Sequence, residues 1–341
     1  MIAVMAGRTV IAPAQLPAGL VTALIGAPFL GWLLWVVVMS LSEDLDPVHL
    51  TARNLSVAYD HDTIIANLDF SAVRGAFTAL VGANGSGKST LLRTLAGLIA
   101  PIGGVVVLDG RAISERSTKR LAREIGMLAQ APVAPEGLTV LDLVRQGRYP
   151  HRAMFSRWSK DDECACNAAL EMTEMVGLRD RALDGLSGGQ RQRAWIALAL
   201  AQETPMLLLD EPTTFLNLAH QIDLMELVRK LVRTQGKTVV AVLHDLNQAA
   251  RYADTMVMLK AGDIVFASPP VEVMTEDALH EVFDVRARII PDPFTGAPMC
   301  IPLRSQTASR SGKGAVSARV NSSARMVLRD QMCGDGIAKS S

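Results

Sequence analysis

The sequence predicts an α/β fold with strands buried on both faces and polar side chains at their carboxyl ends. Three apolar runs support it. Residues 77–81 lead through a glycine-rich turn into a helix, 206–209 end at two acidic residues, and 239–243 end at His244 and Asp245. Such runs are typical of parallel strands, and parallel sheets place ligands at the carboxyl ends of their strands. We therefore expect functional residues at these three turns.

The remaining elements follow from periodicity and turn residues. Strands are predicted at 50–59, 105–108, 125–129 and 286–290, and helices at 91–98, 117–123, 161–176, 194–201 and 272–283.

The composition allows a large core and argues against a nucleic-acid partner. Of 341 residues, 49% are hydrophobic, and Lys plus Arg balance Asp plus Glu at 34 each. A balanced charge gives no basic field for a phosphate backbone. The four cysteines form no C-x-x-C pair, so the sequence predicts packing thiols in a reduced, cytosolic chain.

The first segment, residues 1–47, differs in composition from the rest of the chain. No charged residue occurs from 9 to 42, and 20–41 is almost wholly apolar, long enough to cross a membrane as a helix. It is a poor signal peptide, because its basic region is a single Arg8 and a small-residue cleavage pattern is missing. Two interpretations stay open: a membrane anchor, or a chain whose true start is Met39.

The turn after the first apolar run has the pattern of a phosphate-binding loop. It matches G-x-x-x-x-G-K-[ST] between a strand and a helix, where glycines free backbone N–H groups and a helix N-terminus faces an anion. Lys88 would reach the β/γ-phosphate oxygens of ATP, and the Ser89 hydroxyl would ligate Mg²⁺. The predicted nucleotide-binding residues are Gly82, Asn84, Gly85, Gly87, Lys88, Ser89 and Thr90.

The other strand ends supply acid, amide and imidazole groups. Asp210 is predicted to hold Mg²⁺ through its water shell, and Glu211 to polarise the attacking water. Gln130, after the strand 125–129, would ligate Mg²⁺ or orient water, and His244 would contact the γ-phosphate. The predicted catalytic residues are Lys88, Gln130, Glu211 and His244, and the predicted metal ligands are Ser89, Gln130 and Asp210.

A second phosphate cradle lies between these motifs. Ser187 is a potential N-cap, and it stands in the sequence L-S-G-G-Q at 186–190 before a helix. Together with the phosphate loop and the acidic strand end, this sequence resembles the ATP-binding-cassette (ABC) ATPases over residues 48–303. In that family two cassettes pair head to tail, and each ATP lies between one chain's phosphate loop and the other's L-S-G-G-Q sequence.

The resemblance implies roles for individual residues. Tyr59 would stack on adenine, Ser187 and Gly189 would contact the γ-phosphate bound by the opposite chain, Gln130 would be the Q-loop residue and His244 the switch histidine.

The resemblance also implies a helical subdomain at 131–185 that grips a permease. Its predicted groove carries a basic-aromatic patch of Arg148, Tyr149, His151 and Trp158. One position departs from the family pattern: Asn217 stands where Asp is usual, so we expect modest impairment of hydrolysis or of coupling between the two sites.

Longer stretches resemble ATPase subunits of ferric-siderophore importers, particularly the ferric-enterobactin type. They are 147–151, 193–197, 200–204 and 242–249. The resemblance implies an ATPase, peripheral on the cytoplasmic face of the membrane, that uses ATP and Mg²⁺ to power import of iron(III)-siderophore complexes. Its partners would be a second cassette, permease subunits and, indirectly, a substrate-binding protein. Haem or cobalamin import stays an alternative.

Two other interpretations remain. A soluble ABC protein acting on ribosomes or DNA would normally carry two cassettes or a coiled-coil insertion, and neither occurs in this sequence. Residues 8–40 resemble the last membrane helix of the partner permeases, so the chain could instead be a defective permease–ATPase fusion. Residues 304–341, rich in Ser, Arg, Gly and Ala, predict a disordered tail.

Overall fold

The computed structural model describes residues 48–305, apart from 60–61, 131, 133, 154–155 and 215. The predicted apolar segment 1–47 and the predicted tail from 306 onward lie outside the described residues. None of the described helices is both long and apolar enough to cross a membrane.

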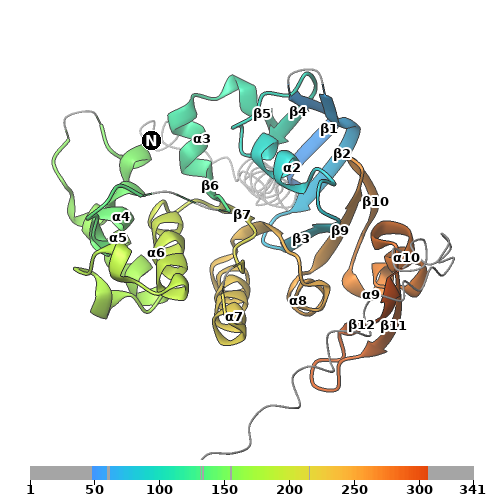
Figure 1. Ribbon diagram of the computed structural model, residues 1–341. Coiled ribbons are helices and arrows are strands. Elements are labelled where there is room, and N and C mark those ends of the chain that lie inside the picture. The colour runs from blue at the N-terminus through green and yellow to red at the C-terminus, as the bar shows by residue number, and fades with distance from the viewer. Residues whose placement is uncertain are drawn as a thin grey trace, which may run out of the picture.

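A six-stranded sheet forms the centre of the fold (Figure 1). Its order is β10 (Asp263–Ser268), β9 (Thr255–Lys260), β3 (Phe77–Gly82), β8 (Thr238–Val242), β7 (Met206–Asp210) and β6 (Ile125–Leu128). All neighbours are parallel except the antiparallel edge pair β9 and β10. Every residue of β7 and β8 is buried, which confirms the expectation drawn from their apolar runs.

A second, antiparallel sheet covers the helix that follows the glycine-rich turn (Figure 1). Its order is β2 (Asp62–Val73), β1 (Val48–Tyr59), β4 (Gly103–Leu108) and β5 (Arg111–Ala112). Leu50 and Leu55 of this sheet, Leu91 and Leu92 of α2 (Lys88–Leu95) and Val242 of the central sheet belong to one buried cluster. The helix is thus fixed between two sheets, and its N-terminus is fixed with it.

The helices follow their capping residues. The helices with a side-chain cap are α3 (Thr118–Glu124, capped by Ser117), α4 (Val140–Gln146, Thr139), α5 (Lys160–Met172, Ser159), α6 (Gly188–Ala201, Ser187), α7 (Leu218–Gln235, Asn217), α8 (Leu246–Tyr252, Asp245) and α10 (Glu276–Phe283, Thr275). Each cap side chain accepts a hydrogen bond from a backbone N–H of the first turn, a group that would otherwise lack a partner.

Within the described part of the chain, four single-turn 3₁₀ segments join these elements: η1 (Ile113–Glu115), η2 (Tyr149–His151), η3 (Val176–Leu178) and η4 (Leu183–Gly185). The hairpin β11 (Val285–Pro291) and β12 (Pro298–Ser305) ends the described chain, and Asn247 of α8 exchanges two hydrogen bonds with the backbone of Cys300 in β12.

Four predicted helices have different bounds. The helix predicted at 91–98 is α2, at residues 88–95, and the helix predicted at 161–176 is α5, which ends at Met172 before Glu174 takes φ +58°. The helix predicted at 272–283 is two helices, α9 (Pro270–Val273) and α10, because Thr275 is extended and caps the second one. The helix predicted at 194–201 begins six residues earlier, at Gly188, directly after its cap Ser187.

The described cysteines, Cys164, Cys166 and Cys300, are free thiols, and the predicted packing role is wrong for Cys164, which is exposed. Cys166 is buried in the α5 core, and burial raises its pKa to about 11. This thiol is therefore a packing group, as the sequence predicts.

Candidate active site

The glycine-rich turn joins β3 to α2 and depends on the absence of side chains at two points. A Cβ on Gly82 would lie 2.2 Å from the carbonyl oxygen of Leu259 in the neighbouring strand. Gly87, the N-cap of α2, has φ +95°, a backbone conformation that favours glycine. The turn can therefore curl tightly over the helix N-terminus and present its backbone N–H groups there.

Lys88 lies at the centre of this turn. Its Nζ donates hydrogen bonds to the carbonyl oxygens of Gly82 (2.9 Å) and Ala83 (2.8 Å), and the residue is buried. Burial lowers the pKa of Lys88 below its ordinary value, whereas the carboxylates of Glu211 and Asp210 act in the opposite direction. The ammonium group is thus held in the loop, where it would face a bound phosphate chain.

Asp210 ends β7 and is fully buried. The Ser89 hydroxyl donates to its Oδ1 at 2.8 Å. Its Oδ2 lies 3.5 Å from Nη2 of Arg93 but has no hydrogen-bond partner among the described residues. A buried carboxylate oxygen without a donor, next to a serine hydroxyl, is a donor set that suits Mg²⁺.

Glu211 is the most heavily contacted carboxylate of the site. Its Oε2 accepts hydrogen bonds from Nε2 of Gln130 and from Oγ1 of Thr214, the latter at 3.2 Å. Its Oε1 lies 2.7 Å from Nε2 of His244, and its side chain is only 11% exposed. The backbone of Glu211 has φ +52°. An amide, a hydroxyl and an imidazole therefore orient this carboxylate.

These groups surround one cavity of about 450 Å³. Its lining residues are Ile64, Asn84, Gly85, Ser86, Gly87, Lys88, Ser89, Thr90, Gln130, Glu211 and His244. The structure thus brings together the three turns singled out in the sequence, with Gly82 and Asp210 directly beside them. Ile64 was not predicted, because the strand that carries it, β2, lacks regular alternation: its burial changes register along the strand.

Three predicted binding residues lie elsewhere. Among the residues that the structure describes, Tyr59, Ser187 and Gly189 do not line this cavity. Tyr59 is 44% exposed at the end of β1. Ser187 caps α6, and its hydroxyl accepts from the backbone N–H of Gln190 at 3.3 Å. Gly189 packs against the ring of His220, since a Cβ there would meet His220 Cδ2 at 2.5 Å.

The predicted basic-aromatic patch is wrong for two of its four residues. Arg148 is buried and pairs with Asp162, so its charge is internal. Nε2 of His151 lies 2.7 Å from the carbonyl oxygen of Gln202.

A surface groove of about 460 Å³ does occur at this place. Tyr149 and Trp158 line it together with Asp142, Arg145, Gln146 and Arg152. The guanidinium groups of Arg145 and Arg152 lie 5.2 and 5.4 Å from the centre of the Trp158 ring.

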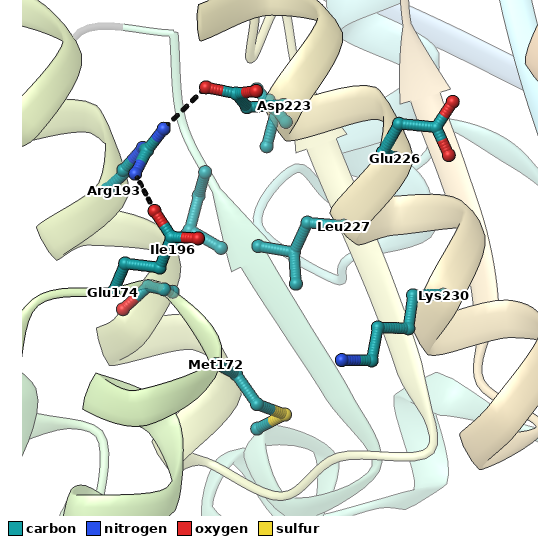
Figure 2. Close-up of a pocket in the computed structure, with 10 residues that line it drawn as sticks. Met172, Glu174, Arg193, Ile196, Asp223, Glu226, Leu227 and Lys230 are labelled. Carbon is teal, nitrogen blue, oxygen red and sulfur yellow. Dashed lines mark hydrogen bonds and ion pairs between the residues drawn. The ribbon is translucent and has the colours of Figure 1, made fainter.

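Another cavity, of about 380 Å³, lies between α5 and α6 on one side and α7 on the other. Figure 2 shows Arg193 bridging this gap. Its Nη1 donates to Glu174 Oε2 at 2.7 Å and its Nη2 to Asp223 Oδ2 at 2.6 Å. Arg193 therefore joins α6, whose first turn contains the end of the L-S-G-G-Q sequence, to α7.

Comparison with known proteins agrees with this site. The family described as ABC transporter matches residues 65–214. The chain is 49% identical over 253 residues to the achromobactin transport ATP-binding protein of Dickeya dadantii, and 49% over 254 residues to the ferric enterobactin transport ATP-binding protein of Escherichia coli. Each match covers 74% of this chain and 94% of the relative.

Solved structures agree as well. An ABC transporter in an inward-facing conformation matches with TM-score 0.66 and 29% identity, over 76% of this chain and 99% of that one. A dimeric bacterial ABC transporter cassette matches with TM-score 0.59 and 29% identity, over 64% of this chain and 98% of that one.

Proposed function

Because this chain belongs to the ABC transporter family and is an ATPase cassette of it, we propose that it powers import of iron(III)-siderophore complexes through a membrane permease. The proposal is supported by 49% identity, along 94% of their length, to transport ATP-binding proteins for achromobactin and ferric enterobactin. The cassette would be residues 48–303, with 131–185 as its helical subdomain.

The observation that carries the ATPase assignment is the meeting of four separate segments in one cavity. The phosphate loop, Gln130, Glu211 and His244 all line it, although up to 160 residues separate Asn84 from His244 in the chain. The loop's N–H groups and Lys88 would bind and neutralise the triphosphate. Glu211 would accept a hydrogen bond from the attacking water, and His244 and Gln130 would orient that carboxylate.

Mg²⁺ would be held by Ser89 and Gln130, with Asp210 acting through water. The unpartnered buried oxygen of Asp210 supports this assignment. When bound, the ion would neutralise charge on the β/γ-phosphates.

A second copy of the chain would complete each site. Ser187 and Gly189 lie away from the chain's own phosphate-loop cavity, which supports a head-to-tail pair in which they contact the nucleotide bound by the other copy. The similar solved cassette is dimeric. Tyr59, exposed at the end of β1, would be free to stack on adenine.

The permease would bind the groove around Trp158. Its exposed Tyr149 ring and its half-buried Trp158 and arginine side chains suit a partner segment that brings both apolar and acidic groups. The chain would then be peripheral on the cytoplasmic face, with the substrate-binding protein linked to it only through the permease.

Uptake in cells lacking this chain tests the proposal. The wild-type gene should restore uptake of ⁵⁵Fe-loaded enterobactin or achromobactin, and Glu211→Gln, which keeps the size but removes the carboxylate, should not. Haem and cobalamin uptake are measured in parallel. Normal siderophore uptake in the deletion strain, with loss of haem or cobalamin uptake, would transfer the assignment to those ligands. Purified chain without ATPase activity would instead support the defective fusion.

A further inference from the structure

The turn that follows Glu211 is fixed by a side chain from α7. Residues 212–214 form a turn and residue 216 belongs to neither a helix nor a strand, so their carbonyl groups need partners from elsewhere. The side-chain amide nitrogen of Gln221 donates to the carbonyl oxygens of Leu216, at 3.0 Å, and Thr213, at 3.4 Å. One amide group therefore bridges two points of this turn.

The same turn contacts the carboxylate of Glu211. Thr214, between the two bridged residues, donates its hydroxyl to Glu211 Oε2 at 3.2 Å. Glu211 has φ +52°, a conformation that L-residues hold only when the surroundings fix it. A change in the turn would thus reach both the hydroxyl contact and the strained backbone that carries the carboxylate.

The other end of Gln221 leads to the helix after His244. Gln221 Oε1 accepts from Nε2 of Gln248 at 2.7 Å. Gln248 is 9% exposed, and its backbone N–H donates to Asp245 Oδ1, the cap of α8, at 3.1 Å. Asp245 directly follows His244, whose Nε2 lies 2.7 Å from Glu211 Oε1. The contacts therefore form a closed ring that reaches both oxygens of Glu211.

We propose that Gln221 and Gln248 are positioning residues for ATP hydrolysis, which hold the turn that carries Thr214 and the start of α8 at fixed positions around Glu211. The proposal rests on the proposed function in one respect, the role of Glu211 as the group that orients water. A carboxamide suits position 221 because it donates to the turn on one side and accepts from Gln248 on the other. A carboxylate there accepts on both sides and would face two carbonyl oxygens.

Among the described residues, the hydrogen bonds of the Gln221 and Gln248 side chains do not reach the phosphate loop, so the two glutamines should affect turnover and not nucleotide binding. We expect Gln221→Ala to lower kcat roughly tenfold, less than the roughly hundredfold that a catalytic group misplaced by about 1 Å can cost. The Kd for ATP should stay within about twofold of wild type. Gln221→Glu should not restore kcat, and Gln221→Ala/Gln248→Ala should be no slower than Gln221→Ala, because one broken contact already opens the ring.

The assay uses the full chain, steady-state ATP hydrolysis and binding of a fluorescent ATP analogue. Gln235→Ala is the matched control, because Gln235 lies at the far end of α7 and its amide contacts Met172 Sδ. Its kcat should equal that of wild type. A kcat of Gln221→Ala within about twofold of wild type, or a parallel loss of ATP binding, would overturn the proposal.

Amide hydrogen exchange gives a readout that does not need activity. Peptides covering 212–220 should exchange faster in Gln221→Ala and Gln248→Ala than in wild type. In Gln235→Ala the same peptides should exchange at the wild-type rate. Unchanged exchange would refute the ring even if the proteins were inactive. If Glu211→Gln hydrolyses ATP like wild type while the exchange result holds, the proposed role of Glu211 fails and the ring remains as a structural device.

Discussion

Replacing Arg148 by Met should destabilise the protein strongly. Arg148 pairs with Asp162, and neither residue is a predicted catalytic group. Arg148 donates from Nε to Asp162 Oδ1 at 3.0 Å and from Nη1 to the carbonyl oxygen of Ala201 at 2.8 Å. It thereby joins the end of α4, the first turn of α5 and the end of α6. Its Nη1 also reaches Glu203 at 2.6 Å.

The magnitude follows from exposure. The side chains of Arg148 and Asp162 are 5% and 6% exposed, so removing the guanidinium leaves a buried carboxylate without its counter-charge, which costs about 3–5 kcal/mol. Glu203 is 57% exposed, and its share is under about 1 kcal/mol because water screens it. Burial by itself would lower the pKa of Arg148, but its hydrogen bonds to Asp162 and Glu203 raise it, in line with a pair that is charged in the folded state.

Unfolding in guanidinium chloride measures this loss of stability. The variants are Arg148→Met, Arg148→Met/Asp162→Asn and the control Arg120→Met. Arg120 is 60% exposed and pairs with Glu124 on one helix face, so its loss should cost under about 1 kcal/mol. Removing both buried charges should recover at least half of the loss seen in Arg148→Met, since no unpaired charge remains. A loss below about 1 kcal/mol in Arg148→Met would refute the reasoning.

Three further predictions concern other sites. Gly189→Ala should destabilise the protein by about 1–3 kcal/mol, and adding His220→Ala should relieve most of it in thermal unfolding, since the new methyl group collides with that ring. Burial lowers the pKa of His49, so the neutral imidazole stabilises the fold fully above about pH 6.5, and this contribution is lost as the pH falls below that value. The unfolding free energy of His49→Gln should therefore depend less on pH between about 7 and 5 than that of wild type. Asn217→Asp should keep the cap of α7, a hydrogen bond at 3.0 Å in which the backbone N–H of His220 donates to Oδ1 of residue 217, and should change stability by under about 1 kcal/mol. It should raise ATPase activity modestly. Unchanged activity per site would show that the missing charge is irrelevant.

Local patterns explain why the phosphate loop and the acidic strand end could be predicted. Gly82 to Thr90 is a contiguous motif, and its position between an apolar strand and a helix is set by neighbours in sequence. Asp210 and Glu211 end a strand whose five residues are all buried. In each case the hydrophobic pattern of neighbouring residues is enough to place the functional side chains at the end of a strand.

Side chains that depend on distant partners were not predicted. Arg148 resembles a surface arginine until Asp162 and Ala201 are known to surround it, and these lie 14 and 53 residues away. Gln221 and Gln248 are 27 residues apart on two helices, and only the packing of α7 beside α8 brings their amides together. Their only signal in the sequence is polarity on a partly buried helix face, which is too common to indicate a role.

The separation of Ser187 from the phosphate loop of its own chain has a genetic consequence. If a pair of copies shares each site, a chain with Lys88→Ala and a chain with Ser187→Arg are each inactive alone, because every site contains one defect. In a mixed pair, both defects fall in one site and the other site is assembled from two intact halves. Two null alleles should therefore complement each other when they are expressed together, a behaviour that a cassette working as an independent unit would not show.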